Sequence, residues 1–440
     1  MSTAAAGNRD FRLLDYAALW GSLGATLYLM PFGSLLVPAL SIERAVLAAG
    51  VAAFVAALLI TAVSWMAARS GQSTLDLLTG VFGQRSATPL GLLLLARHIA
   101  FAAFALALIG DVAQLASQRA LGAGMRPLWV VAFGLVGCAL AVAGPHFTVR
   151  KVLRRAGIWA VLLVAALVAV SAYLEYEVPA YLKRPASGGW PEFWQAVDIM
   201  LIVPLLWLPV VADYGRLARR PGDAAFGSFW GMFTATVCFG VLGIIYLPAV
   251  ESGDIPGFVV GMELGLGALL FLLVLQVDEV FANLQPAATI MDRLPFRFAG
   301  GSLVPLAFLA AIFFALPFHL MAAEPWFLLL GSLFVPLFGV LIADQFGPPL
   351  PALRAAAPLT AWASGFLAYQ WIAPPDATAW REAMQWLFGD TLGLPFPLTD
   401  HAPWLGAGIA AFLAAFAVQL AVRWMLAGLQ SLQRPAGALD

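Results

Sequence analysis

The sequence predicts an all-α integral membrane protein with about twelve membrane-spanning helices. Of its 440 residues, 62% are hydrophobic and only 11% are charged, and the mean hydropathy is +0.90. A water-soluble domain cannot bury so large a share of apolar side chains, so many of them must face lipid. The formal net charge of −1 argues against a nucleic-acid partner. We expect no cofactor, and a monomer in the lipid bilayer.

Twelve apolar windows are long enough to cross a bilayer. They lie at 15–40, 45–67, 88–116, 128–147, 156–174, 195–212, 226–248, 266–290, 303–322, 326–344, 358–373 and 404–426. The chain is thereby divided into a polar N-terminus at 1–14, helical regions at 15–174, 195–344 and 358–426, a loop at 374–403 and a tail at 427–440. We interpret the loop as an interfacial flap with a short helix. An even number of spans puts both termini on one side.

The distribution of lysine and arginine orients these spans. Sixteen of these residues lie on the side of the N-terminus, six lie on the other side, and Arg97 lies within a span. Because positively charged loops stay in the cytoplasm, we expect cytoplasmic termini, an external 374–403 loop and a location in the cell (inner) membrane. Residues 1–13 are polar and no cleavage motif follows them, so a removable signal peptide is not expected.

Two spans contain helix breakers at related positions. Pro31 and Gly33 are expected to interrupt the first span, and Pro204 and Pro209 the sixth. Interrupted spans at corresponding places in two halves of a chain point to the binding site of a transporter. Their separation by five spans is the one that an inverted repeat of five plus five helices requires.

The eighth span carries polar side chains at membrane depth. Such residues usually face the interior of the helix bundle, because exposing a charge to lipid costs about 2.5–3.5 kcal/mol even on the lenient insertion scale. Helical spacing places Gln276, Glu279 and Asn283 on one face and Asp278 and Gln285 on another. Gln276 and Glu279 are therefore candidate substrate contacts, and Asp278 and Glu279 are candidate carriers of a coupling proton or cation.

The third span supplies Arg97, Phe101 and Phe104 on one face, with His98 beside it. Arg97 and the two carboxyls of the eighth span both lie roughly 15 Å deep, near the membrane midplane. An ion pair between Arg97 and a carboxylate is therefore predicted, either as a structural link or as part of transport. We interpret His98 as a residue of helix contact.

Four parts of the chain resemble the nucleobase:cation symporter-1 family of purine, pyrimidine and related permeases. They lie at 19–24 with 33–38, 68–74 with 82–86, 207–216, and 334–346. The segment from Trp207 to Tyr214 and the end of the first span, from Gly33 to Pro38, look most like the cytosine and hydroxymethylpyrimidine branch. The resemblance implies a LeuT-like fold of ten core helices plus two, working by alternating access.

The resemblance also implies roles for single residues. Asn283 lies in a segment similar to the family's substrate segment, where an Asn hydrogen-bonds the ring amide, and an amide matches such an edge in donor and acceptor. Phe101 and Trp207 would stack on the ring, although Trp207 also fits an interface anchor. Sodium-using members carry hydroxyls where this chain has Val277 and Asp278, which favours a proton over sodium as coupling ion.

Asp213, Arg216 and Asp344 belong to the family motifs and end their spans, so they are predicted to form gate or helix-end ion pairs. The sequence thus predicts an importer of a pyrimidine-like base or thiamine precursor, such as cytosine or hydroxymethylpyrimidine, and not an enzyme. A purine, allantoin, hydantoin or amino-acid permease of the same fold is the alternative. An intramembrane enzyme is a remote one, because the four histidines show no metal-ligand spacing.

The predicted topology can be tested with single cysteines in a background lacking Cys138 and Cys238. A cysteine at Asp376 should react with a membrane-impermeant maleimide in intact cells, whereas one at Ala436 should react only after lysis, because the tail is predicted to be cytoplasmic. The reverse labelling pattern would overturn the assigned orientation.

Overall fold

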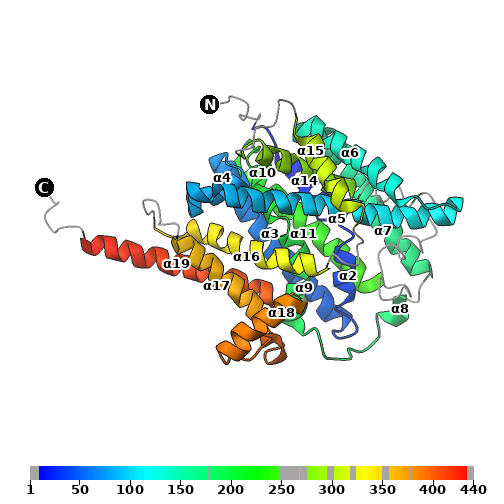
Figure 1. Ribbon diagram of the computed structural model, residues 1–440. Helices are drawn as coiled ribbons and strands as arrows, with labels where there is room; N and C mark the ends of the chain where they lie inside the picture. The colour runs from blue at the N-terminus through cyan, green and yellow to red at the C-terminus, as the bar shows by residue number, and fades with distance from the viewer. Residues whose placement is uncertain are drawn as a thin grey trace.

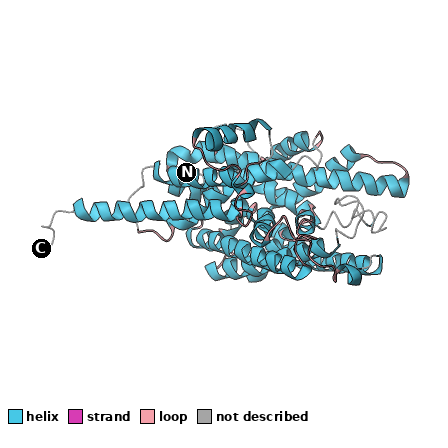
Figure 2. Cartoon of the chain, turned by 90° about the horizontal axis from the view of Figure 1, so that it is seen from below, coloured by secondary structure: helices cyan, strands magenta, loops and turns pink. Residues whose placement is uncertain are grey.

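The computed structural model describes residues 9–175, 178–246, 267, 275–294, 302–317, 324–348, 356–375 and 378–433. These residues form helices and contain no β-strand, and the helices pack side by side in one bundle (Figures 1 and 2). The prediction of an all-α fold is therefore confirmed.

The first part of the bundle comprises α1 (Leu13–Leu23), α2 (Leu29–Ser34), α3 (Ile42–Ser70), α4 (Thr74–Phe82), α5 (Ala87–Leu121), α6 (Arg126–Phe147) and α7 (Ile158–Glu175). A π-helical segment, Thr148–Gly157, joins α6 to α7. The second part comprises α8 (Val178–Tyr181), α9 (Phe193–Leu205), α10 (Leu208–Gly215), α11 (Pro221–Tyr246), α14 (Val277–Met291), α15 (Val304–Ala315) and α16 (Glu324–Asp344). The last helices are α17 (Ala356–Ile372), α18 (Thr378–Met384) and α19 (Ala407–Gln433), and α19 extends beyond the bundle in Figure 1.

Within the described chain, five helical stretches are long and apolar enough to cross a membrane by themselves, and the bent pair α9–α10 adds a sixth. α15 and residues 328–344 are shorter apolar helices. Parts of the predicted spans at 266–290 and 303–322 lie outside the described residues. The predicted loop at 374–403 contains α18, which continues into a π-helical turn at Gln385–Thr391.

The first span is broken at residues 24–28, between α1 and α2. Pro31 and Gly33 lie after this break, which corrects the expectation that they interrupt the span. Pro31 is in the first turn of α2, where its missing N–H breaks no helical hydrogen bond. Gly33 instead allows close packing, because a Cβ there would lie 2.6 Å from the carbonyl oxygen of Gly240 in α11.

The sixth span is broken between α9 and α10, whose axes differ by 43°. Pro204 lies near the end of α9, and Pro209 occupies one of the first two positions of α10. The two prolines therefore lie on either side of this break, and Leu206 and Trp207 form the link between the two helices.

Small residues bring the broken first span close to α11. A Cβ at Gly231 would lie 2.7 Å from the carbonyl oxygen of Ala17 in α1, and one at Gly243 would lie 2.4 Å from that of Met30 in α2. Without side chains at these positions, the backbones of α11 and of both halves of the first span approach each other. The two halves of the broken first span therefore both pack against α11, which is a continuous helix.

Gly144 interrupts α6 near the end of the fourth predicted span. Its φ of 83° and ψ of 168° are not helical, and Pro145 follows directly. A positive φ favours glycine, and proline suits the start of the next helical stretch. The hydroxyl of Thr148 donates to the carbonyl oxygen of Leu140 at 2.8 Å and ties the two sides of this interruption together.

A short segment before α1, residues 9–12, links three parts of the chain at one end of the bundle. The backbone of Phe11 bonds to Leu217 and Arg219, which follow α10, at 3.1 and 2.9 Å. Asp10 pairs with Arg150 of the π-helical segment at 2.7 Å. Burial tends to raise the pKa of Asp10, but Arg150 and His146 outweigh it and lower this pKa below its ordinary value.

Asp198 connects the first half of the broken sixth span to the last helix. This buried side chain of α9 accepts hydrogen bonds from the backbone N–H groups of Gly408 and Ile409, both at 2.9 Å, at the start of α19. The carboxyl therefore satisfies N–H groups that a helix start leaves without intrahelical partners.

Replacing this cap should weaken the fold. Asp198→Ala removes two hydrogen bonds at the start of α19 and should cost about 0.5–2 kcal/mol. The measurement is the thermal unfolding midpoint of the purified protein in detergent, with Asp390→Ala at an exposed position as the control. Equal midpoints for the two variants would contradict the capping role.

Candidate functional site

Polar groups from four parts of the bundle meet between the two broken spans, and we call them the polar cluster. Its members are Ser22 and Thr26 at the first break, Arg97 and His98 of α5, Leu206 and Trp207 at the second break, and Asp278, Glu279 and Asn283 of α14. Every member is buried, and the side chain of Arg97 is among the largest fully buried ones. The cluster is therefore closed to solvent in this conformation.

The guanidinium of Arg97 is the centre of the cluster. It donates one hydrogen bond to the side-chain oxygen of Asn283 and another to the carbonyl oxygen of Leu206. Leu206 directly follows α9, where helical carbonyl groups lack intrahelical partners and the helix dipole favours a cation. Arg97 thus ties α5 to α14 and to the break of the sixth span.

His98 completes the hydrogen bonding on one side of this guanidinium. Its Nδ1 lies 3.1 Å from a terminal nitrogen of Arg97. The same Nδ1 lies 3.3 Å from the side-chain oxygen of Asn283, so it accepts from the guanidinium in one tautomer and donates to the amide oxygen in the other. His98 therefore takes part in the polar cluster, beyond the helix contact that the sequence predicted.

Aromatic rings lie against the same guanidinium. The Arg97 carbon Cζ is 4.1 Å from the ring centroid of Phe101 and 5.8 Å from that of Trp207. Phe101 in turn contacts Phe104 edge to face, with ring centroids 5.8 Å apart. The candidate aromatic residues are therefore brought together, and Trp207 is buried at the helix break.

The two carboxyls of α14 face the first broken span. The hydroxyl of Ser22 donates to Asp278, and the side chain of Thr26 lies near Glu279. Among the described residues, no carboxylate oxygen lies within 4 Å of the Arg97 guanidinium, so the predicted ion pair between Arg97 and a carboxylate is not formed. The hydroxyls of the first break compete for the carboxyls, and Asn283 takes the place of the carboxylate at Arg97.

Several polar atoms in and beside the cluster have no hydrogen-bond partner within the described part of the chain. They are Nε of Arg97, Nε2 of His98, Oδ1 of Asp278, Oε1 of Glu279, and both side-chain polar atoms of Gln276. Leaving such atoms unpaired in a buried place is costly, so each is a position where a bound molecule would gain a hydrogen bond.

The predicted gate residues have different surroundings. Asp344 forms an ion pair with Arg423 of α19 and accepts a hydrogen bond from Gln419 at 3.0 Å. The Arg216 side chain donates to the backbone carbonyl of Asp213 at 3.2 Å, whereas Oδ2 of Asp213 has no partner among the described residues. Asp344 is thus in a helix-end ion pair, and Arg216 contacts Asp213 through the backbone.

Sequence reasoning did not single out Ser22, Thr26 or the backbone carbonyl of Leu206. Ser22 lies in the first segment of the family resemblance, which was the available signal. Leu206 contributes its main-chain carbonyl oxygen, which every residue has, so its side-chain type gives no sign of this role. Only the positions of the two breaks bring these three groups into the cluster.

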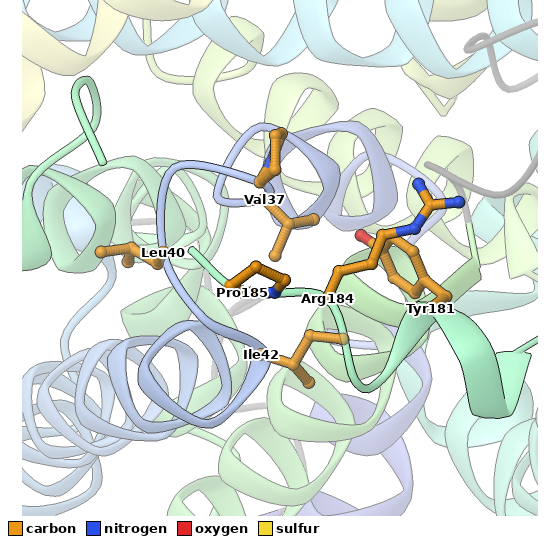
Figure 3. Close-up of a pocket in the computed structure, with 7 residues that line it drawn as sticks. Val37, Leu40, Ile42, Tyr181, Arg184 and Pro185 are labelled. Atoms are coloured by element: carbon orange, nitrogen blue, oxygen red, sulfur yellow. The ribbon is translucent and has the colours of Figure 1, made fainter. Parts of the chain in front are cut away.

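A cavity of about 150 Å³ lies elsewhere, near the end of the first span, and shares no residue with the polar cluster (Figure 3). Its lining includes Val37, Ile42, Tyr181 and Arg184, and Arg184 stacks on the Tyr181 ring at 5.5 Å. It offers one charged side chain among mostly apolar groups, so it lacks the paired donors and acceptors of the polar cluster.

The chain is similar in structure to known transporters. A structure of Mhp1, a nucleobase-cation-symport-1 family transporter in a closed conformation with bromovinylhydantoin bound, matches with a TM-score of 0.69 and 15% identity, covering 97% of this chain and 96% of that one. An inward-facing conformation of Mhp1 matches with a TM-score of 0.67 and 16% identity, covering 97% and 94%.

MhsT in complex with L-phenylalanine matches with a TM-score of 0.56 and 16% identity, covering 93% of this chain and 98% of that one. The chain has the LeuT-like fold. No protein-family model matches the chain, and no curated protein matches it in sequence. At these identities the likeness establishes the fold, and the cytosine and hydroxymethylpyrimidine branch stays a prediction.

Asn283 should matter for the integrity of the polar cluster. Asn283→Ala leaves the buried guanidinium with one acceptor fewer, which should cost about 1–3 kcal/mol of stability. The thermal unfolding midpoint in detergent should fall, while that of Gln285→Ala should change little, because Gln285 is only half-buried and lies outside the cluster. A larger loss for Gln285→Ala would mean that the wrong face of α14 has been assigned.

Proposed function

We propose that this protein is a secondary active transporter that imports a small planar heterocycle by alternating access, coupled to a cation. The preferred substrates are a pyrimidine-like nucleobase or a thiamine precursor, such as cytosine or hydroxymethylpyrimidine. The observation that carries the proposal is the closed polar cluster between the two broken spans. Its fold is shared with Mhp1, described as a nucleobase-cation-symport-1 family transporter.

The chemistry of the cluster suits a flat ring with polar edges. Phe101, Phe104 and Trp207 provide aromatic faces around Arg97, and Gln276 and Glu279 of α14 have polar atoms without a partner in the described chain. A heterocycle stacks on such faces while its N–H and carbonyl groups pair with the polar atoms. The bromovinylhydantoin bound to Mhp1 supports a ring-shaped ligand.

Asp278 is the proposed carrier of a coupling proton. It is buried, bonded to the Ser22 hydroxyl at the first break, and leaves one oxygen without a partner in the described chain. A buried carboxyl is most stable when neutral, so binding a proton suits it. Val277 beside it offers no side-chain oxygen for a sodium ion.

We further place the protein in the inner cell membrane as a monomer with cytoplasmic termini, with Asp213, Arg216 and Asp344 acting at its gates. A second candidate, an amino-acid permease, is favoured by the likeness to MhsT in complex with L-phenylalanine. Hydantoin, allantoin and purines are the further alternatives within ring-shaped substrates. Competition by these compounds and by phenylalanine against labelled cytosine would separate the candidates.

Transport should depend on protons rather than on sodium. In proteoliposomes, uptake of labelled cytosine or hydroxymethylpyrimidine should persist when choline replaces sodium and should collapse with an uncoupler. Asp278→Asn should abolish accumulation while exchange of internal for external substrate continues, because the variant binds ligand but carries no proton. Uptake that strictly requires sodium and does not respond to the proton gradient would contradict proton coupling.

Absence of carrier-mediated uptake for every compound named above would remove the transport proposal itself. Glu382→Gln, at an exposed position of α18, serves as the matched control for loss of a carboxylate and should transport normally.

A further inference from the structure

The guanidinium of Arg97 is not fully paired in the closed cluster. It has five N–H donors, and the described chain offers it two acceptors, on Asn283 and Leu206, and a third on His98 in one tautomer of that ring. Its Nε is buried without a partner. The unused donors belong to a planar group that binds two acceptor atoms of a carboxylate or similar anion in parallel.

The positive charge of Arg97 has no carboxylate in direct contact within the described chain. The groups that accept from it are neutral, and Glu279 attracts it only from beyond 4 Å. Asp278 is bonded to the hydroxyl of Ser22, and Glu279 lies near the side chain of Thr26. Buried charges in proteins are normally paired, because an unpaired one keeps its full desolvation penalty.

Asn283, by contrast, has most of its hydrogen bonding satisfied. Its oxygen accepts from Arg97, and its Nδ2 donates to the backbone oxygen of Glu279 at 2.8 Å. The residue that resemblance assigns to ring recognition therefore positions the guanidinium. Among the described residues, the atoms of α5 that are left without a partner are Nε of Arg97, which is a donor, and Nε2 of His98, whose role depends on the tautomer.

We propose that Arg97 determines the specificity of the site, and that the transported molecule presents a planar anion to it. This inference rests on the transport of a small planar heterocycle proposed above and narrows the substrate to an anionic ring, in place of neutral cytosine and hydroxymethylpyrimidine. The anion is either a carboxylate on a small ring or the ionised O=C–N–C=O edge of an acidic heterocycle, since both offer adjacent acceptor atoms in one plane. The rest of the ligand stacks beside Phe101 and Trp207, donates to the free oxygens of Gln276 and Glu279, and can accept from the side-chain nitrogen of Gln276.

Binding of three closely related pyrimidines tests the inference. Uracil is the neutral ring, and orotate is the same ring with a carboxylate. The third compound, 5,5-dimethylbarbiturate, is blocked at C5 and carries an ionised ring imide without a carboxylate when all three are titrated in buffer above the pKa of its ring N–H. Calorimetric titration of the purified, full-length protein should show one of the two anions binding about 10- to 150-fold more tightly than uracil, the range expected for a hydrogen-bonded charge. Which anion binds distinguishes the two sources of charge.

Variants of Arg97 connect this preference to the guanidinium. Arg97→Gln should bring the affinity ratio of anion to uracil close to one, and Arg97→Lys should keep part of it, because lysine retains the charge but not the planar pair of donors. Arg126→Gln is the matched control, since Arg126 is also a buried arginine but pairs with Asp111 away from the cluster. Its affinity ratio should equal that of the unaltered protein.

The outcomes separate this inference from the proposed function. Binding of uracil as tight as that of both anions, or an anion preference that survives in Arg97→Gln, overturns the role of Arg97 and leaves transport of a neutral ring standing. Binding of none of the three pyrimidines, of cytosine or of hydroxymethylpyrimidine overturns both. If Arg97→Gln does not fold, the test is whether Arg97→Lys keeps only part of the preference for the anion. An undiminished preference in Arg97→Lys counts against recognition by the planar pair of guanidinium donors.

Discussion

The placement of one buried cation organises the centre of this protein. The Arg97 guanidinium bonds to Leu206 at the break of the sixth span and to Asn283 of α14, so three separate parts of the chain meet on one side chain. A charge in a dry interior must find acceptors, and a broken helix supplies them as carbonyl groups without intrahelical partners. The break of the sixth span and the position of Arg97 therefore depend on each other.

α14 is linked to both broken spans by different chemistry. Through Asp278 it bonds to Ser22 beside the first break, and through Asn283 and Arg97 it reaches the second. A proton on Asp278 or a ligand beside Arg97 would thus change the contacts of one helix with each broken span in turn. In the transport function that we propose, this shared helix is where binding of cation and substrate can be coupled.

Contacts around the polar cluster hold the two broken spans against the rest of the bundle. Glycines of α11 let its backbone approach α1 and α2, while residues 9–12 and Asp198 hold the broken spans at opposite ends. Because long side chains are absent there, the backbones of α11 and of the first span pack closely against each other. Polar links at the ends can form and break. The arrangement is consistent with motion of the broken spans against a packed support.

The sequence by itself determined the fold class and the residues of interest in α5 and α14. Apolar length and composition report how a segment is solvated, and helical spacing places Glu279 and Asn283 on one face, so both follow from local chemistry. The tertiary structure decided the partners. It moved the first break to residues 24–28, turned the carboxyls toward Ser22 and Thr26, and gave Arg97 an amide and a main-chain carbonyl in place of a carboxylate. Hydrogen bonds between distant segments depend on how helices pack, and a backbone carbonyl is present at every residue, so no sequence pattern specifies which one is used.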